Sequence, residues 1–113
     1  MHILNSINQM QDEMKDWRRD LHQIPELGLE EYKTSSYIKG KLKEWNIKFK
    51  DGYAGTGVVA WVKGSKGSSK KSIGLRADFD ALPMPEKNNF DHKSSHEGMM
   101  HACGHDGHTA MLL

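Results

Sequence analysis

The feature that most constrains the fold is a change in the spacing of apolar residues near position 46. Before that point, apolar side chains recur every three or four residues, at Ile3, Ile7, Met10, Met14, Trp17 and Leu21. This spacing predicts an amphipathic helix that packs through its Trp and Met side chains. A coiled coil would need more heptads than the chain provides before Pro25. A turn with Pro25 and Gly28 then leads to a second predicted helix over residues 29–45.

After position 46 the pattern favours strands. Residues 46–50 alternate between polar and apolar, residues 58–62 form a β-branched run that predicts a buried strand, and residues 72–79 predict a third strand. A solvated lysine-containing loop over 63–71 and an irregular loop over 83–98 separate these segments from a final helix expected near Gly107. The order predicts an α/β fold in which two N-terminal helices precede the strands of a mixed sheet.

Length and charge exclude several functional classes. The 113 residues suit one domain, and 16 Lys and Arg against 15 Asp and Glu give a net charge of +1, which offers no broad attraction for nucleic acid. No apolar run approaches the ~20 residues that a membrane-spanning helix needs, and the N-terminus lacks the apolar core of a secretory signal. The single cysteine excludes an internal disulfide and favours a cytoplasmic setting.

Residues 100–111, with the sequence MHACGHDGHTAM, carry the strongest chemical signal. Cys103 and His105 are two positions apart, so in an extended backbone a thiolate and an imidazole point the same way and suit zinc or a similar transition metal. Asp106 is a secondary candidate, either as a ligand or as a residue that orients a histidine. The spacing leaves two other interpretations open. One is a histidine-rich loop around a structural cysteine, and the other is a helix, disfavoured by its glycines, with His101, His105 and His108 on one face.

A second signal is the pair Asp78 and Asp80 at the end of the predicted third strand. The two carboxylates point to the same side, so one could bind a metal while the other orients a ligand or a general base. The alternative is a strand end in which Asp78 pairs with Arg76. His22, in the last turn of the first helix, is explained by the helix dipole, and the spacing indicates no chemistry for it.

Three segments in order, WRRDLHQIPELGLEEYKT, GLRADFDALPMPE and HEGMMHACGHDGHTAMLL, resemble a known family. They are similar to the N-terminal part of the metal-dependent amidohydrolases, a metallopeptidase family that includes hippurate hydrolases, aminoacylases, N-acetyldiaminopimelate deacetylases and indole-acetyl-amino-acid hydrolases. The resemblance covers the chain from Trp17 to Leu113. It implies hydrolysis of a small N-acyl amino acid or peptide to a carboxylic acid and an amine.

The resemblance also implies a site and its cofactor. The family's metal ligands fall on Cys103 and His105, and its supporting catalytic Asp falls on Asp78, with Asp80 as a further secondary candidate. Related peptidases carry a His where this chain has Arg76, which weakens the case for a direct ligand on this strand. The implied cofactor is zinc, manganese, cobalt or nickel, with two ions in a complete binuclear site.

The resemblance further implies that other parts of the enzyme lie downstream. These are a general-base Glu, an adjoining Glu ligand, two further His ligands and a smaller dimerisation domain. Residues 1–113 are therefore expected to form the truncated N-terminal portion of a zinc-peptidase-like catalytic domain, inactive alone, whose complete enzyme is a homo-oligomer. The alternative function is that of a non-catalytic metal-binding or partner-binding remnant. A redox-sensing thiol at Cys103 is a weaker possibility.

Overall fold

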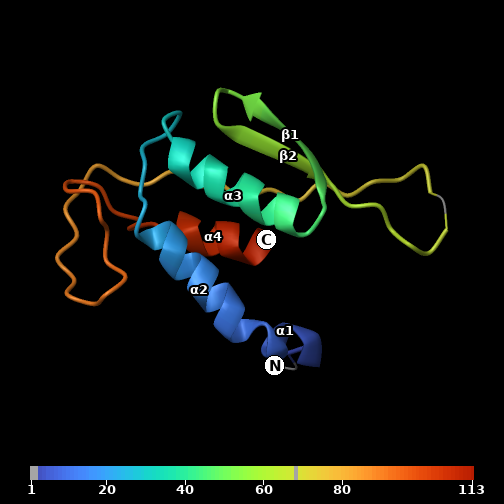
Figure 1. The fold of residues 1–113 in the computed structure, drawn as a ribbon, viewed down its shortest axis with the longest axis horizontal. Coiled ribbons are helices and arrows are strands. Elements are labelled where there is room, and N and C mark those ends of the chain that lie inside the picture. The colour runs from blue at the N-terminus through green and yellow to red at the C-terminus, as the bar shows by residue number, and fades with distance from the viewer. Residues whose placement is uncertain (1–2, 68) are drawn as a thin grey trace.

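The computed structural model describes residues 3–67 and 69–113, so Met1, His2 and Ser68, the last of these within the predicted loop over 63–71, lie outside it. Figure 1 shows helices packed beside one hairpin, with long loops extending from either end of the molecule. In chain order the elements are α1 (Asn5–Gln9), α2 (Gln11–His22), α3 (Tyr32–Glu44), β1 (Lys48–Tyr53), β2 (Gly57–Trp61) and α4 (His105–Leu112).

The predicted first helix is divided at Met10 into α1 and α2. Only the second half of its apolar face is covered, because Trp17 and Leu21 are buried whereas Ile3, Ile7 and Met10 are exposed. The expectation that Met10 fills the core is therefore wrong. α1 makes few contacts beyond α2, so nothing in the described chain covers its apolar side chains.

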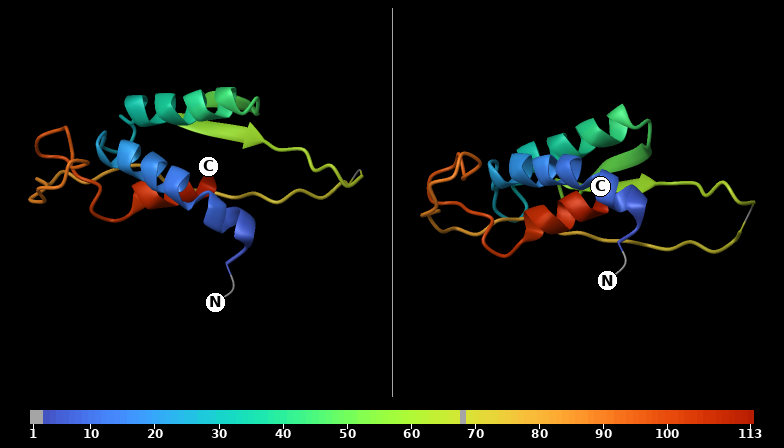
Figure 2. Two further views of the ribbon diagram at one scale, coloured as in Figure 1. Left: turned by 60° about the horizontal axis from the view of Figure 1, so that its bottom comes forward. Right: turned by 90° about the horizontal axis from the view of Figure 1, so that it is seen from below.

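The core lies between α2 and α4, which run side by side in Figures 1 and 2. Trp17 and Leu21 from α2 meet Ala110 from α4, and the ring of Trp45 lies 5.1 Å from that of Trp17. Trp45 follows the last turn of α3, so this contact connects α3 to the core. Burial of these apolar surfaces is the main stabilising contribution to the arrangement.

Residues on either side of α3 explain where the helix begins and ends. The carboxylate of Glu26 accepts the backbone N–H groups of Lys33 (3.0 Å) and Thr34 (2.7 Å), which have no partner within the helix. Asn46, with φ of 56°, adopts the left-handed conformation that commonly ends a helix. The observed helix is therefore shorter at its start than the predicted range 29–45.

β1 and β2 form an antiparallel hairpin that packs on α3. The two predicted strands over residues 46–50 and 58–62 are confirmed with slightly shifted bounds, but the expectation that residues 58–62 are buried is wrong. Val59 and Trp61 are exposed, with 53% of the Trp61 surface accessible. A two-stranded sheet covered by one helix leaves much of its surface open, whatever the β-branched content of its strands.

The predicted third strand over residues 72–79 does not form in the described chain. Ile73 and Leu75 are 89% and 77% exposed, and β1 and β2 are the only strands that the described residues contain. A strand requires a neighbouring strand to pair with its backbone groups, and this segment has no such neighbour among the described residues. The α/β class is confirmed, with an antiparallel hairpin where the sequence predicted a mixed sheet.

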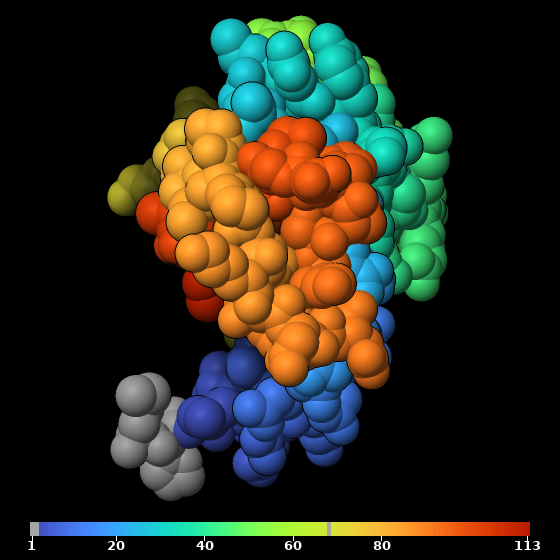
Figure 3. All heavy atoms as spheres, turned by 90° about the vertical axis from the view of Figure 1, so that its left-hand side faces the viewer, coloured from blue at the N-terminus to red at the C-terminus, as the bar shows by residue number. Residues whose placement is uncertain are grey.

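The irregular loop predicted over residues 83–98 is confirmed. It is closed at its base by the antiparallel bridge between Leu82 and Met100, and the N–H of Ser95 donates to the carbonyl of Gln23 at the end of α2. Figure 3 shows this loop (orange) as much of the surface at its end of the molecule. No helix in the described part of the chain is both long and apolar enough to cross a membrane.

Candidate metal centre

The first turn of α4 presents two histidines to the segment that carries Asp78. His105 and His108 are three positions apart and therefore lie on one face of the helix, with ring centroids 5.4 Å apart. Nδ1 of His108 is 2.9 Å from Oδ1 of Asp78, and Nε2 of His105 is 3.8 Å from the same oxygen. The three residues each offer a ligand atom within 4.8 Å of the others, so together they could hold one metal ion.

Asp80 fixes the orientation of His105. Nδ1 of His105 lies 2.9 Å from Oδ1 of Asp80 and 3.0 Å from the carbonyl oxygen of the same residue. Both partners are acceptors, so Nδ1 carries the ring hydrogen and donates it, which leaves the lone pair on Nε2. Nε2 is the atom that faces Asp78. A histidine that binds a metal through one nitrogen and a carboxylate through the other is the usual arrangement in metal sites.

The electrostatics favour an ionised Asp78. A hydrogen bond from His108 lowers the pKa of Asp78 below its ordinary value, and the nearby His105 acts in the same direction. The hydroxyl of Thr109 donates to the Asp78 carbonyl over 3.1 Å, which attaches this extended segment to α4. The alternative ion pair with Arg76 also forms, at 3.7 Å, but the Arg76 side chain is largely exposed and such pairs contribute little.

The other predicted site residues lie elsewhere. Cys103 is exposed and has no place in the group formed by Asp78, His105 and His108. Asp106 is 1% exposed, and its carboxylate forms a hydrogen bond with His22 and an ion pair with Arg18, both on α2. The structure therefore brings Asp78 and His105 together, places Asp80 behind His105, and directs Asp106 toward α2.

His108 is the member of the group that the sequence argument did not select. The signal was present, because a helical spacing places His105 and His108 on one face, but the glycines disfavoured a helix. Gly104, with φ of 103°, lies immediately before α4 and turns the chain into it, while Gly107 is tolerated within its first turn. His101, the third member of that helical alternative, precedes the helix and is buried.

The donor set fits a transition metal. Two imidazoles and one carboxylate match a three-ligand zinc site that keeps a position open for water or substrate. Calcium and magnesium prefer sites built from oxygen alone, so these donors disfavour them.

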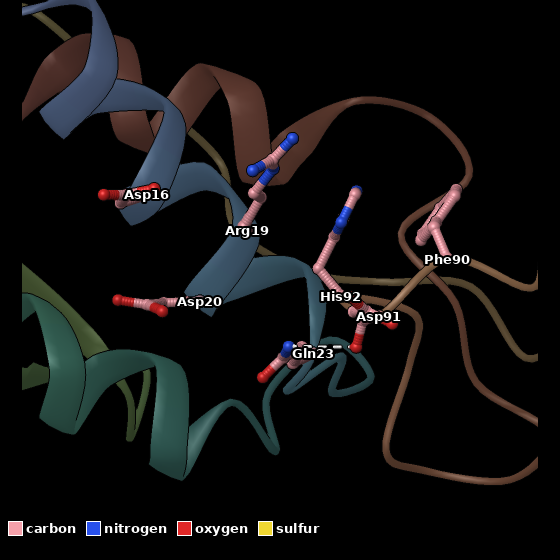
Figure 4. Close-up of a pocket in the computed structure, with 7 residues that line it drawn as sticks. All are labelled: Asp16, Arg19, Asp20, Gln23, Phe90, Asp91 and His92. Atoms are coloured by element: carbon pink, nitrogen blue, oxygen red, sulfur yellow. Dashed lines mark hydrogen bonds between the residues drawn. The ribbon is translucent and has the colours of Figure 1, made fainter.

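A separate hollow of about 720 Å³ lies between α2 and the loop that follows Met84. Figure 4 shows its mixed lining, in which Gln23 donates to the carbonyl of Asp91. The ring of Phe90 stacks on that of His92 with centroids 4.0 Å apart. None of the predicted site residues lines this hollow; its lining residues are Asp16, Arg19, Asp20, Gln23, Phe90, Asp91 and His92.

Comparison with known proteins shows which family the chain resembles. Residues 74–113 match the model described as Peptidase family M20/M25/M40. The chain is 46% identical over 113 residues, its whole length, to hippurate hydrolase of Campylobacter jejuni, of which it spans 29%. Over its length the chain is similar to the N-terminal part of proteins of this peptidase family. It is also 51% identical over 96 residues, 85% of its length, to N-acetyl-L-cysteine deacetylase of Bacillus subtilis, of which it spans 23%.

A solved structure supports the same relationship. The chain resembles a dinuclear metal-binding peptidase of the M20 family from Bacillus subtilis, with a TM-score of 0.82 and 41% sequence identity. The match covers 91% of this chain and 28% of that protein. The chain therefore corresponds to the N-terminal part of its M20 relatives and spans less than a third of their length.

Proposed function

We propose that this chain forms part of the active site of a metal-dependent amidohydrolase that cleaves small N-acyl amino acids. The reaction adds water across the amide bond and releases a carboxylic acid and an amino acid. The observation that carries the proposal is the group of Asp78, His105 and His108, with Asp80 behind His105. The names of two relatives, a hippurate hydrolase and an N-acetyl-L-cysteine deacetylase, support the substrate class.

Each residue of the group would have a distinct part in holding divalent metal. His105 would bind through Nε2 while Asp80 keeps its ring in place, and Asp78 and His108 would supply the other donors of the group. Cys103 lies outside this group, and the family resemblance alone suggests its thiolate as a further ligand. In a complete binuclear centre, such ions polarise the amide carbonyl and lower the pKa of bound water. The likeness to the Bacillus subtilis protein, a dinuclear metal-binding peptidase, supports two ions.

The proposal places residues 1–113 in the N-terminal portion of a catalytic domain. The general base, the remaining ligands and a dimerisation domain would come from sequence that the longer relatives have and this chain does not span. A lone exposed cysteine suits a reducing compartment, so we place the complete, homo-oligomeric enzyme in the cytoplasm.

The test is titration of the 113-residue chain with Co²⁺, followed by visible absorption. We expect binding that His105→Ala weakens by at least about 10-fold and that Asp80→Asn weakens by about 10–100-fold. Cys103→Ser should remove the thiolate-to-cobalt absorption. His92→Gln is the matched control, because this histidine lies outside the group. Cobalt affinity that is unchanged by His105→Ala would contradict the proposed site.

Activity separates the enzyme from the alternative, a non-catalytic metal-binding or partner-binding remnant. The chain alone should not hydrolyse N-acetyl or N-benzoyl amino acids with added zinc, manganese or cobalt, because we expect the general base in the part of the relatives that this chain does not span. Turnover that Cys103→Ala abolishes would show that residues 1–113 are sufficient for activity. A gene that continues beyond Leu113 into a Glu-Glu pair would favour the enzyme over the remnant.

A further inference from the structure

His22 occupies an unusual position for a histidine at a helix end. It is the last residue of α2, its side chain is 2% exposed, and it lies between two carboxylates. Its Nδ1 is 2.6 Å from Oδ2 of Asp106, and its Nε2 is 3.0 Å from Oε1 of Glu86. Both carboxylates are as buried as the ring, with side-chain exposures of 1% and 2%. The helix dipole alone does not account for this geometry.

The two contacts use the full hydrogen-bonding capacity of the ring. Two carboxylates are acceptors when ionised, so both are satisfied by one imidazole only if each ring nitrogen carries a hydrogen. Arg18, one turn earlier on α2, forms an ion pair with Asp106, with Nε 3.0 Å from Oδ2. Burying charged groups is costly, and apolar side chains of similar size would often be as stable. A role in stability alone is therefore a weak explanation for this cluster.

One contact connects His22 to the metal-binding turn. Asp106 lies directly after His105 in the first turn of α4, and its other carboxylate oxygen accepts the N–H of Gly107 at 2.9 Å. The bonds from His22 and Arg18 therefore fix the rotation of this turn about the helix axis. That rotation determines whether His105 and His108 face Asp78.

The other contact connects His22 to the loop that begins beside Asp80. Glu86 accepts hydrogen bonds from the backbone of Ser94 and the side chain of Asn88, which hold the loop around it. The base of this loop is the bridge from Leu82, two positions after Asp80. His22 is thus attached both to the helix that carries the two histidines and to the loop next to the residue that orients one of them.

We propose that His22 is a positioning residue for the metal group, acting through Asp106 to aim the first turn of α4 at Asp78. The inference rests on the proposed function, because it assigns His22 a role in the same metal site. His22 does not touch the group itself, so its effect reaches the metal only through α4. If His22 has this role, substitutions that break its bond to Asp106 should change metal affinity and ligand geometry. Substitutions that keep this bond should not, even when they lower overall stability by the same amount.

Two substitutions separate the two bonds. In His22→Asn the side-chain amide replaces Nδ1 and still donates to Asp106, whereas in His22→Gln the amide lies at the level of Nε2 and reaches Glu86 instead. Both variants lose one of the two bonds, so their losses of stability in urea should be similar. His92→Gln is again the control, because its ring is 6.0 Å from that of His22 but makes neither bond.

Cobalt titration with visible absorption gives the readout. We expect His22→Gln to raise the Kd for Co²⁺ by about 10–100-fold and to alter the cobalt spectrum, while His22→Asn and His92→Gln remain close to the parent chain. Equal cobalt affinities for His22→Asn and His22→Gln would overturn the proposal. If His22→Gln does not fold, Asp106→Asn replaces it, and unchanged cobalt affinity in that variant would overturn the proposal equally.

The same titrations distinguish this inference from the proposed function. Cobalt binding that His105→Ala weakens, but that no substitution of His22 or Asp106 affects, refutes the positioning role and leaves the metal site intact. Cobalt binding that is indifferent to His105→Ala refutes the metal site and the positioning role together.

Discussion

Glu86 allows a sharp test of the electrostatics around His22, through the substitution Glu86→Gln. Burial on its own would raise the pKa of Glu86. Hydrogen bonds from Asn88, His22 and the backbone of Ser94 outweigh that effect and lower the pKa from 4.5 to about 2. The folded state therefore binds the ionised carboxylate more favourably than the unfolded chain does.

The lowered pKa sets both the sign and the size of the effect. A group whose folded pKa is depressed stabilises the protein above its unfolded pKa, and this stability is lost as the pH falls through the folded value. The difference between 4.5 and about 2 corresponds to at most about 3 kcal/mol. Because the surrounding loop is largely exposed, we expect screening to reduce the loss at neutral pH to about 1–2 kcal/mol.

Urea denaturation of the parent chain and of Glu86→Gln, at about pH 7 and about pH 3, measures the effect. The variant should be less stable at neutral pH, and the gap in the free energy of unfolding should shrink by more than half at the lower pH. Glu97→Gln is the control, since Glu97 is an exposed residue of the same loop. A gap of the same size at both pH values, or no gap at all, would refute the reasoning.

Two further predictions concern the scaffold, both measured by urea denaturation. Glu26→Gln should lower the free energy of unfolding by about 1–2 kcal/mol, because it weakens the acceptor for the first N–H groups of α3; a loss no larger than that of the exposed Glu30→Gln would contradict this. Leu21→Ala should cost about 2–5 kcal/mol, since Leu21 is 0% exposed in the core between α2 and α4. A cost as small as that of the exposed Leu4→Ala would show that this core is not closely packed.

Burial of the helices was predictable where another element covers the apolar face. The strands were predictable only where a second strand follows closely in the sequence. Trp17 and Leu21 are buried as their spacing predicts, but Ile3 and Ile7 continue the same pattern without any covering element in the described chain. Residues 72–79 have a good strand composition, yet a strand depends on a neighbour that composition does not supply. The spacing of apolar residues identifies one face of an element, but it does not identify the element that covers this face.

The candidate site was predictable in its residue types and less so in its geometry. The alternation around Asp78 and Asp80 predicts that one carboxylate binds a metal while the other orients a ligand. Asp80 does contact His105, and metal binding by Asp78 stays a prediction. His108 was missed because Gly104 and Gly107 were weighed as helix breakers. Gly104 does not interrupt the helix, because it lies just before α4 and turns the chain into it. Whether a glycine breaks or precedes a helix depends on its backbone angles, which residue types alone do not determine.

The three segments that carried the family resemblance meet at one place, the first turn of α4. Arg18 and His22 of the first segment contact Asp106, and Asp78 and Asp80 of the second contact His108 and His105. Contacts between residues as far apart as His22 and Asp106 leave no periodic trace in the sequence. Both sets of contacts hold the same short helical turn. A substitution of Arg18 or His22 should therefore change the positions of the proposed metal ligands, even though neither residue belongs to the group.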